Sequence, residues 1–167
     1  MPPKKAPTYD DLVERVARLA PRLRRKKVTV ATAESCTGGL LAAVLSENSG
    51  SSDHYLGGGV VYSNGAKTEL AGVAADLIHA HGAVSSVVAA ALARGARGRL
   101  GARIGLGITG IAGPLGATAG KPVGLVYVAI DSDALSSVKR NKFPFDRAGN
   151  RLASVGVALD LLEQAVE

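Results

Sequence analysis

The chain has 167 residues, of which 47% are hydrophobic and 20% charged, a composition typical of a globular protein of about one domain. Its 21 glycines follow no repeat period, which excludes a collagen-like fibre. No run approaches the ~18 apolar residues of a membrane span, and no apolar stretch of signal-peptide length follows the first lysines. We therefore expect no membrane partner.

The charge and the single cysteine bear on partners and compartment. Cys36 cannot form an internal disulfide, which favours a reducing compartment and a cytoplasmic protein. A net charge of +6 is compatible with nucleic-acid binding. Only 4% of the residues are aromatic, however, and most cations are spread along the chain. The charge therefore favours a basic surface that attracts phosphorylated small molecules, and we expect no nucleic-acid partner.

Residues 1–8 are predicted to be a disordered tail, and residues 9–167 a single domain. Thr8 or Asp10 is expected to cap a first amphipathic helix, which Pro21 should kink or break. Further helices are predicted from helical spacing of apolar residues. They cover residues 40–45, 66–70, 74–81, 86–100 (capped by Ser85) and 147–166 (started by Asp146). The Asn64-Gly65 dipeptide is interpreted as a strand-to-helix turn rather than a hairpin.

Five runs rich in β-branched or alternating apolar residues are predicted to be strands. They cover residues 28–33, 56–63, 103–109, 123–131 and 137–145. The alternation of strands and helices predicts an α/β fold with helices on both faces of one sheet. The link between the last two strands is too short for a helical crossover, so this pair should be antiparallel and the sheet mixed. The last strand is more polar and should lie at an edge.

Neither one motif match nor the histidines indicate a binding site. Gly105, Gly107 and Gly110 spell the G-x-G-x-x-G of dinucleotide-binding folds. That fingerprint requires a helix to open at its end, and here a glycine- and proline-rich loop follows instead. The histidines lack carboxylates or thiols at metal-ligand spacing, so we expect no metal and no cofactor.

Three polar, glycine-containing loops are candidates for chemistry. In the first, Ser35 lies at a strand-to-helix junction, where free backbone N–H groups can hold a phosphate or an oxyanion. Capping of the helix by Ser35 or Thr37 explains the same residues equally well. In the second, Lys67 could act as a general base if its pKa were lowered, with Tyr62 relaying or positioning the proton. A surface lysine on a short helix is the alternative.

The third loop, residues 107–124, leaves a strand end, where ligands bind in open α/β sheets. Its length favours a functional role over a plain connection. Arg147 and Arg151, one helical turn apart, could clamp a phosphate or simply be solvated. Cys36 could replace Ser35 as nucleophile, but neighbouring side chains point in different directions, so at most one of the two should face the site.

Six sequence blocks in these regions resemble the CinA C-terminal domain family. They are AESCTGG (33–39), GSS (50–52), VVYSNGAK (60–67), HGAVS (81–85), TGIAGP (109–114) and KPVG (121–124). The resemblance implies a three-layer α/β/α sandwich with a mixed, mostly parallel sheet of about five strands. It also implies a homo-oligomer that deamidates nicotinamide mononucleotide to nicotinate mononucleotide and ammonia, in pyridine nucleotide salvage.

The resemblance further implies roles for individual residues. Ser35 would be the nucleophile, assisted by Lys67 and Tyr62, with backbone donors near Gly38 stabilising the oxyanion. The residues expected to bind the substrate are Glu34, Thr37, Gly38, Gly39, Asn64, Thr109, Gly110 and Arg151. The alternative function is that of a non-catalytic module, either nucleotide-binding or regulatory in connection with competence or DNA damage.

This chain departs from the family pattern in the third loop and before the last helix. Leu115-Gly116-Ala117 stand where the family usually has an acidic residue and paired glycines. Ala119 and Gly120 precede Lys121 where acidic residues are common, and Phe145 stands where a glycine often precedes Asp146. If the loop contacts ribose or phosphate, the preferred amide depends on it.

Overall fold

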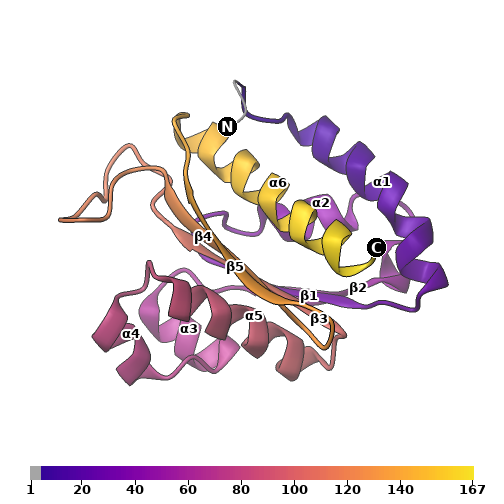
Figure 1. Cartoon of the computed structure of the whole chain (residues 1–167), viewed down its shortest axis with the longest axis horizontal. Helices are drawn as coiled ribbons and strands as arrows, with labels where there is room; N and C mark the ends of the chain where they lie inside the picture. The colour runs from indigo at the N-terminus through magenta and orange to yellow at the C-terminus, as the bar shows by residue number, and fades with distance from the viewer. Residues whose placement is uncertain (1–4) are drawn as a thin grey trace.

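The computed structural model describes residues 5–167, which form one five-stranded sheet between two layers of helices (Figure 1). The strands are β1 (Val30–Glu34), β2 (Tyr55–Val60), β3 (Ile104–Gly110), β4 (Leu125–Ser132) and β5 (Ser136–Lys142). The helices are α1 (Tyr9–Arg25), α2 (Leu40–Ser46), the 3₁₀ turn η1 (Ser51–Asp53), α3 (Asn64–Ala71), α4 (Ala75–His81), α5 (Ser86–Leu100) and α6 (Arg147–Ala165).

The strands are ordered β2-β1-β3-β4-β5 across the sheet. Strand β1 is parallel to both β2 and β3, whereas β4 is antiparallel to both β3 and β5. Strand β4 therefore runs against the other four, which confirms a mixed, mostly parallel sheet. The polar strand β5 lies at an edge, as its composition predicted, and the glycine-rich β2 forms the other edge.

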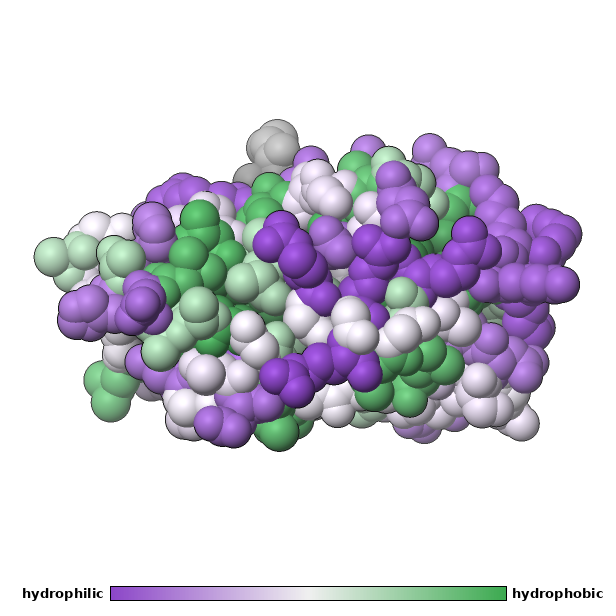
Figure 2. All heavy atoms as spheres, turned by 90° about the horizontal axis from the view of Figure 1, so that it is seen from below, coloured by the Kyte–Doolittle hydropathy of each residue, from purple (hydrophilic) through white to green (hydrophobic). Residues whose placement is uncertain are grey.

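Helices α1, α2 and α6 cover one face of the sheet, and α3, α4 and α5 cover the other (Figure 1). The three-layer sandwich is thus confirmed. The inner side of α6 follows the predicted spacing: Val155, Leu159 and Leu162 are fully buried, and Leu152 is half-buried against the same core. Seen from the side of α3, α4 and α5, the surface is a mosaic of polar and apolar patches (Figure 2).

Helix α5 lies unusually close to β3 because glycines face it. A Cβ atom added at Gly105 would lie 1.9 Å from the carbonyl oxygen of Ala93, and one added at Gly107 would lie 2.6 Å from that of Ala89. Both glycines are inside β3, and no helix follows Gly110. The G-x-G-x-x-G spacing therefore serves the packing of helix on sheet, not a dinucleotide.

Some predicted boundaries were wrong. Pro21 does not break the first helix, which continues to Arg25 because Leu19 and Leu23, on either side of the proline, are buried in the core. Strand β2 ends at Val60, three residues earlier than predicted, and Asn64 already begins α3. The cap residues Thr8, Ser85 and Asp146 are confirmed, each accepting a hydrogen bond from the first turn of its helix.

The expectation of a disordered tail falls partly on residues 1–4, which lie outside the described residues. Residues 5–8 precede α1 without regular secondary structure. Within residues 5–167, no helix combines the length and the apolar character needed to cross a bilayer.

Candidate functional site

The candidate site lies where three parallel strands end. Ser35 directly follows β1, Tyr62 follows β2 by two residues, and residues 110–113 lead out of β3. The carboxyl ends of parallel strands meet at one edge of a sheet. There the three segments surround a cavity of about 260 Å³. Its lining residues are Ser35, Cys36, Tyr62, Asn64, Lys67, Ala83, Val84, Thr109, Gly110, Ile111, Ala112, Gly113, Leu115, Gly116 and Arg147.

Ser35 and Lys67 meet in this cavity. The Nζ atom of Lys67 lies 3.1 Å from the Oγ atom of Ser35. It also lies 3.0 Å from each of the backbone carbonyl oxygens of Val61 and Tyr62, to which it donates hydrogen bonds. The lysine extends from α3 back under the segment that precedes its own helix, so its amine is held at a fixed position beside the serine.

The amine of Lys67 is buried without a counter-ion. The side chain is 2% exposed, and none of the carboxylates in residues 5–167 forms an ion pair with it. Burial lowers the pKa of Lys67 below its ordinary value because desolvation penalises the charged form. The amine donates to Oγ of Ser35 and also lies 3.5 Å from the carbonyl of Ser63. When it loses a proton, its two remaining N–H donors can keep the carbonyls at 3.0 Å, and its lone pair can accept the proton of the Ser35 hydroxyl.

Tyr62 is at the rim of the cavity rather than between the serine and the lysine. Its side chain is 60% exposed, and its hydroxyl accepts a hydrogen bond from Nη2 of Arg147 at 3.2 Å. The other terminal nitrogen of Arg147 donates to the carbonyl of Gly113 at 2.8 Å. Arg147 thereby connects two walls of the cavity, and it is Arg147, not Arg151, that lines the cavity with Ser35.

Glu34 and Thr37 face the start of α2 instead of the cavity. The Glu34 carboxylate accepts hydrogen bonds from the backbone N–H groups of Leu41 and Ala42, at 2.8 and 3.0 Å, and from the Thr37 hydroxyl at 2.7 Å. Both side chains are buried. A carboxylate at a helix N-terminus satisfies free N–H groups and interacts favourably with the helix dipole. The geometry gives these two residues the role of holding the Ser35 loop in place.

Gly38 and Gly39 form the turn between Ser35 and α2, with φ angles of +58° and +96° that favour glycine. The Gly38 N–H donates to the carbonyl of Ser35 at 3.0 Å, so it is not free to bind an oxyanion. Arg151 lies beside this turn and donates to the carbonyl of Thr37 at 2.9 Å. It lines a second cavity, of about 600 Å³, which shares Ala112 and Arg147 with the first.

Thr109, Gly110 and Asn64, which are expected from the sequence to bind the substrate, line the first cavity. The Thr109 hydroxyl donates to the carbonyl of Ala83 at 2.8 Å, which fixes the segment before α5 against the end of β3. A Cβ atom at Gly110 would lie 2.7 Å from the carbonyl of Leu125, so the close approach of β4 requires glycine there.

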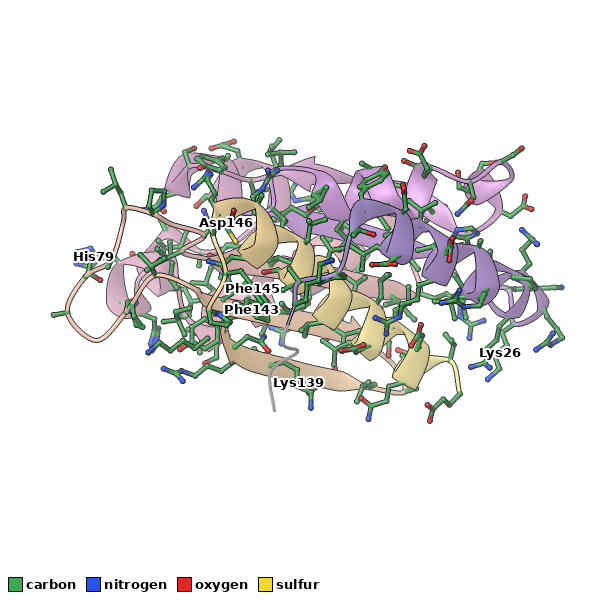
Figure 3. All side chains as sticks on the ribbon, turned by 90° about the horizontal axis from the view of Figure 1, so that it is seen from above. Lys26, His79, Lys139, Phe143, Phe145 and Asp146 are labelled. Carbon is green, nitrogen blue, oxygen red and sulfur yellow. The ribbon has the colours of Figure 1, made fainter. Side chains whose placement is uncertain are left out.

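Asn150 is a supporting residue that sequence reasoning missed. Its side chain is fully buried; it accepts from the backbone N–H of Phe145 at 3.1 Å and donates to the carbonyl of Ala112 at 2.9 Å. It therefore connects the start of α6 to a cavity wall. Figure 3 shows Phe145 and Asp146 at this end of α6, while Lys26 lies at the opposite end of the molecule.

Cys36 also lines the cavity, but its thiol is a poor nucleophile. It is 7% exposed, and burial raises its pKa to about 12. The thiolate is the reactive form of cysteine, so this side chain stays protonated near neutral pH. Within residues 5–167, no three histidine, cysteine or acidic side chains are grouped to hold a metal ion.

Comparison with known proteins places this geometry in a family. Residues 12–166 match the family model described as the CinA C-terminal domain. The chain belongs to the CinA C-terminal domain family. It is 51% identical over 142 residues to a CinA-like protein of Koribacter versatilis, covering 85% of this chain and 34% of that protein. The chain thus spans about one third of the length of that CinA relative.

Solved structures of CinA proteins share the fold over nearly the whole chain. The competence/damage inducible protein CihA of Agrobacterium tumefaciens is 36% identical with a TM-score of 0.91, covering 97% of this chain and 98% of that one. The competence damage-inducible protein A (ComA) of Klebsiella pneumoniae is 33% identical with a TM-score of 0.87, covering 92% and 95%. The resemblance found in the sequence blocks is therefore confirmed at the level of family and fold.

Proposed function

We propose that this CinA-family domain is an amidohydrolase that converts nicotinamide mononucleotide to nicotinate mononucleotide and ammonia. The observation that carries the proposal is the Ser35–Lys67 pair: a hydroxyl 3.1 Å from a buried amine with a lowered pKa and no counter-ion. A serine beside a general base is the arrangement that nucleophilic catalysis of acyl transfer requires. The choice of nicotinamide mononucleotide as the substrate is based on the resemblance to the CinA C-terminal domain family.

The reaction proceeds in two acyl-transfer steps. In the first, Oγ of Ser35 attacks the carboxamide carbon as its proton passes to the neutral amine of Lys67. The C–N bond then breaks, ammonia leaves with the proton from Lys67, and the acyl group remains as an ester on Ser35. In the second step, water attacks the ester and gives a proton to Lys67, which returns it to Ser35 as the carboxylic acid is released; the acid then loses its proton to water or to the ammonia.

The oxyanion needs donors other than the N–H of Gly38, which is already hydrogen-bonded. In the opposite wall, the N–H groups of Ala112 and Gly113 belong to cavity-lining residues and donate to no protein acceptor within residues 5–167. Free backbone donors in a buried wall stabilise developing negative charge. We assign the oxyanion to this wall, which the Asn150 and Arg147 contacts hold in place.

Two guanidinium groups support a phosphorylated substrate. Arg147 lines the catalytic cavity and Arg151 the adjoining one, one helical turn apart. Neither forms an ion pair with a carboxylate in residues 5–167, and each retains N–H donors that a phosphate can accept. We assign the 5′-phosphate to this pair, and Asn64, Thr109 and Gly110 line the same cavity as Ser35 and Arg147.

The test is to incubate the purified protein with nicotinamide mononucleotide and measure both products. Equimolar ammonia and nicotinate mononucleotide are expected. Free nicotinamide, which marks cleavage of the glycosidic bond, or no product at all, would overturn the proposal. Binding of the nucleotide without turnover would instead support the non-catalytic module.

A further inference from the structure

Leu115 is an apolar side chain in an unusual position. It is 85% exposed, whereas the other exposed large hydrophobic residues in residues 5–167 range from 36% to 60%. It also lines the cavity that contains Ser35 and Lys67. An apolar side chain that is exposed at the wall of a polar cavity gains free energy when an apolar group of a ligand covers it.

The loop that carries Leu115 is anchored on both sides. The connection between β3 and β4 projects from the body of the molecule (Figure 1). Before Leu115, the carbonyl of Gly113 accepts from Arg147 at 2.8 Å. After it, Thr118 and Lys121 exchange two backbone hydrogen bonds of 3.0 Å, and Nζ of Lys121 donates to the carbonyl of His81 at 3.0 Å. These contacts tie Leu115 to α6 and to the end of α4.

Other walls of the cavity also offer apolar surface. Val84 and Ile111 line it and are only partly exposed, and the ring of Tyr62 lines its rim. The groups that react or bind charge, Lys67 and Arg147, come from α3 and α6. The cavity therefore combines a polar region, where an amide and a phosphate are bound, with apolar surface suited to the flat face of a ring.

We infer that Leu115 is a specificity-determining residue that covers the aromatic ring of the substrate. The inference rests on the proposed function. It predicts a preference for amides whose carbonyl is carried on a planar ring, because such a ring covers the Leu115 side chain while its carboxamide reaches Ser35. A small aliphatic amide would leave that side chain exposed to water.

The experiment separates contact with the ring from contact with the ribose phosphate. Kd is measured by calorimetry for nicotinamide mononucleotide and for ribose 5-phosphate, which lacks the ring. The variants Leu115→Ala and Leu115→Asp are made in a Ser35→Ala background, so that no turnover occurs. Ala117→Asp is the matched control, since Ala117 is exposed on the same loop and does not line the cavity.

Leu115→Ala should weaken binding of nicotinamide mononucleotide about 5- to 50-fold, the effect of exposing most of a leucine contact. Leu115→Asp should weaken it at least as much, and Ala117→Asp should not. Affinity for ribose 5-phosphate should stay within about twofold in Leu115→Ala. With Ser35 present, Leu115→Ala should raise KM and leave kcat nearly unchanged.

Two results would overturn the inference. One is unchanged affinity for nicotinamide mononucleotide in Leu115→Ala. The other is an equal loss for both ligands that accompanies a change in oligomeric state by sedimentation, which would make Leu115 a contact between copies. If the unsubstituted protein hydrolyses the nucleotide and either result is found, only the Leu115 inference fails. If the unsubstituted protein does not hydrolyse it, the proposed function fails.

Discussion

The amine of Lys67 lies 3.1 Å from the hydroxyl of Ser35, although 32 positions separate them in the chain. Ser35 is fixed because its N–H donates to the carbonyl of Ile108 in the neighbouring strand at 2.9 Å. Lys67 is fixed by two carbonyls of the segment between β2 and α3. The pair is thus assembled by the sheet itself, which keeps the two atoms within the reach that general-base catalysis requires.

Removal of the amine should abolish activity without unfolding the protein. Lys67→Met and Lys67→Arg should each lower kcat at least about 100-fold, since methionine has no base and arginine stays protonated. The free energy of unfolding of Lys67→Met should change by less than about 1 kcal/mol, because the loss of the hydrogen bonds to the carbonyls of Val61 and Tyr62 is offset by the removal of a buried amine that has no counter-ion. Steady-state kinetics and urea unfolding measure both; Lys142→Met, on the exposed edge strand, is the control.

The rate should increase with pH as Lys67 loses its proton. The neutral amine is the active form, and burial lowers its pKa below the ordinary 10.5. The rising limb of kcat/KM should therefore have its midpoint below pH 10.5. A rate that does not increase with pH, or a rising limb whose midpoint is at or above pH 10.5, would show that no amine with a lowered pKa takes the proton.

Two glycines of α5 should respond to alanine in opposite directions. A Cβ at Gly95 would lie 1.8 Å from the carbonyl oxygen of Ala71, whereas one at Gly98 would meet nothing within 4 Å. Gly95→Ala should lower the free energy of unfolding by about 3 kcal/mol or more, because α3 must move away. Gly98→Ala should raise it by about 0.5–1 kcal/mol through helix propensity. Equal effects of the two variants in urea unfolding would contradict the close contact of α5 with Ala71.

Asn150 should matter for both stability and turnover. Asn150→Ala leaves the N–H of Phe145 and the carbonyl of Ala112 without partners, which should cost about 2–4 kcal/mol. It should also lower kcat, because Ala112 belongs to the wall assigned to the oxyanion. Gln164→Ala, exposed on the same helix, should change stability by less than about 0.5 kcal/mol. A loss of stability with no loss of kcat would limit Asn150 to a structural role.

His54 should make the fold sensitive to acid. It is fully buried, and both of its ring nitrogens lack a hydrogen-bond partner. Burial lowers its pKa below the ordinary 6.5. Below pH 6.5 His54 therefore binds a proton more readily in the unfolded chain than in the folded one. The free energy of unfolding decreases as the pH is lowered, by at most about 1.4 kcal/mol per pH unit for this group. Above pH 6.5 the effect is absent.

His54→Leu should accordingly reduce the loss of stability between pH 7.5 and pH 5, as measured by urea unfolding at both values. His79→Gln, which replaces an exposed histidine, should leave that loss unchanged. If both variants lose as much stability as the unsubstituted protein, His54 is not the origin of the acid sensitivity.

The sequence predicted the helix caps, which depend on hydrogen bonds between near neighbours in the chain. It also predicted the location of the site, which depends on parallel strands ending at the same edge of the sheet. Thr8, Ser85 and Asp146 cap their helices because hydroxyl and carboxylate oxygens bind free N–H groups. Ser35 and Lys67 lie together because parallel strands end at one edge of the sheet. The loops that form the cavity were likewise recognisable in the sequence as glycine-containing segments.

The sequence could not predict the direction in which each side chain points at the edge of the sheet where the strands end. Arg147 and Arg151 are one turn apart on α6, yet Arg147 lines the cavity with Ser35 and Arg151 lines only the adjoining one. Glu34 next to Ser35 turns to the start of α2, where three donors satisfy it. No sequence pattern marked Asn150 as a supporting residue. Its partners are backbone groups, the N–H of Phe145 before its own helix and the carbonyl of Ala112, 38 positions away in the chain.

The most direct measurement is ammonia release from nicotinamide mononucleotide by two matched variants of neighbouring residues, Ser35→Ala and Cys36→Ala. Both side chains line the cavity, and each variant removes a single heavy atom. The Ser35 mechanism predicts that Ser35→Ala loses activity at least about 1,000-fold while Cys36→Ala stays within tenfold of the unsubstituted protein. Full activity of Ser35→Ala, or loss of activity in Cys36→Ala alone, would contradict it.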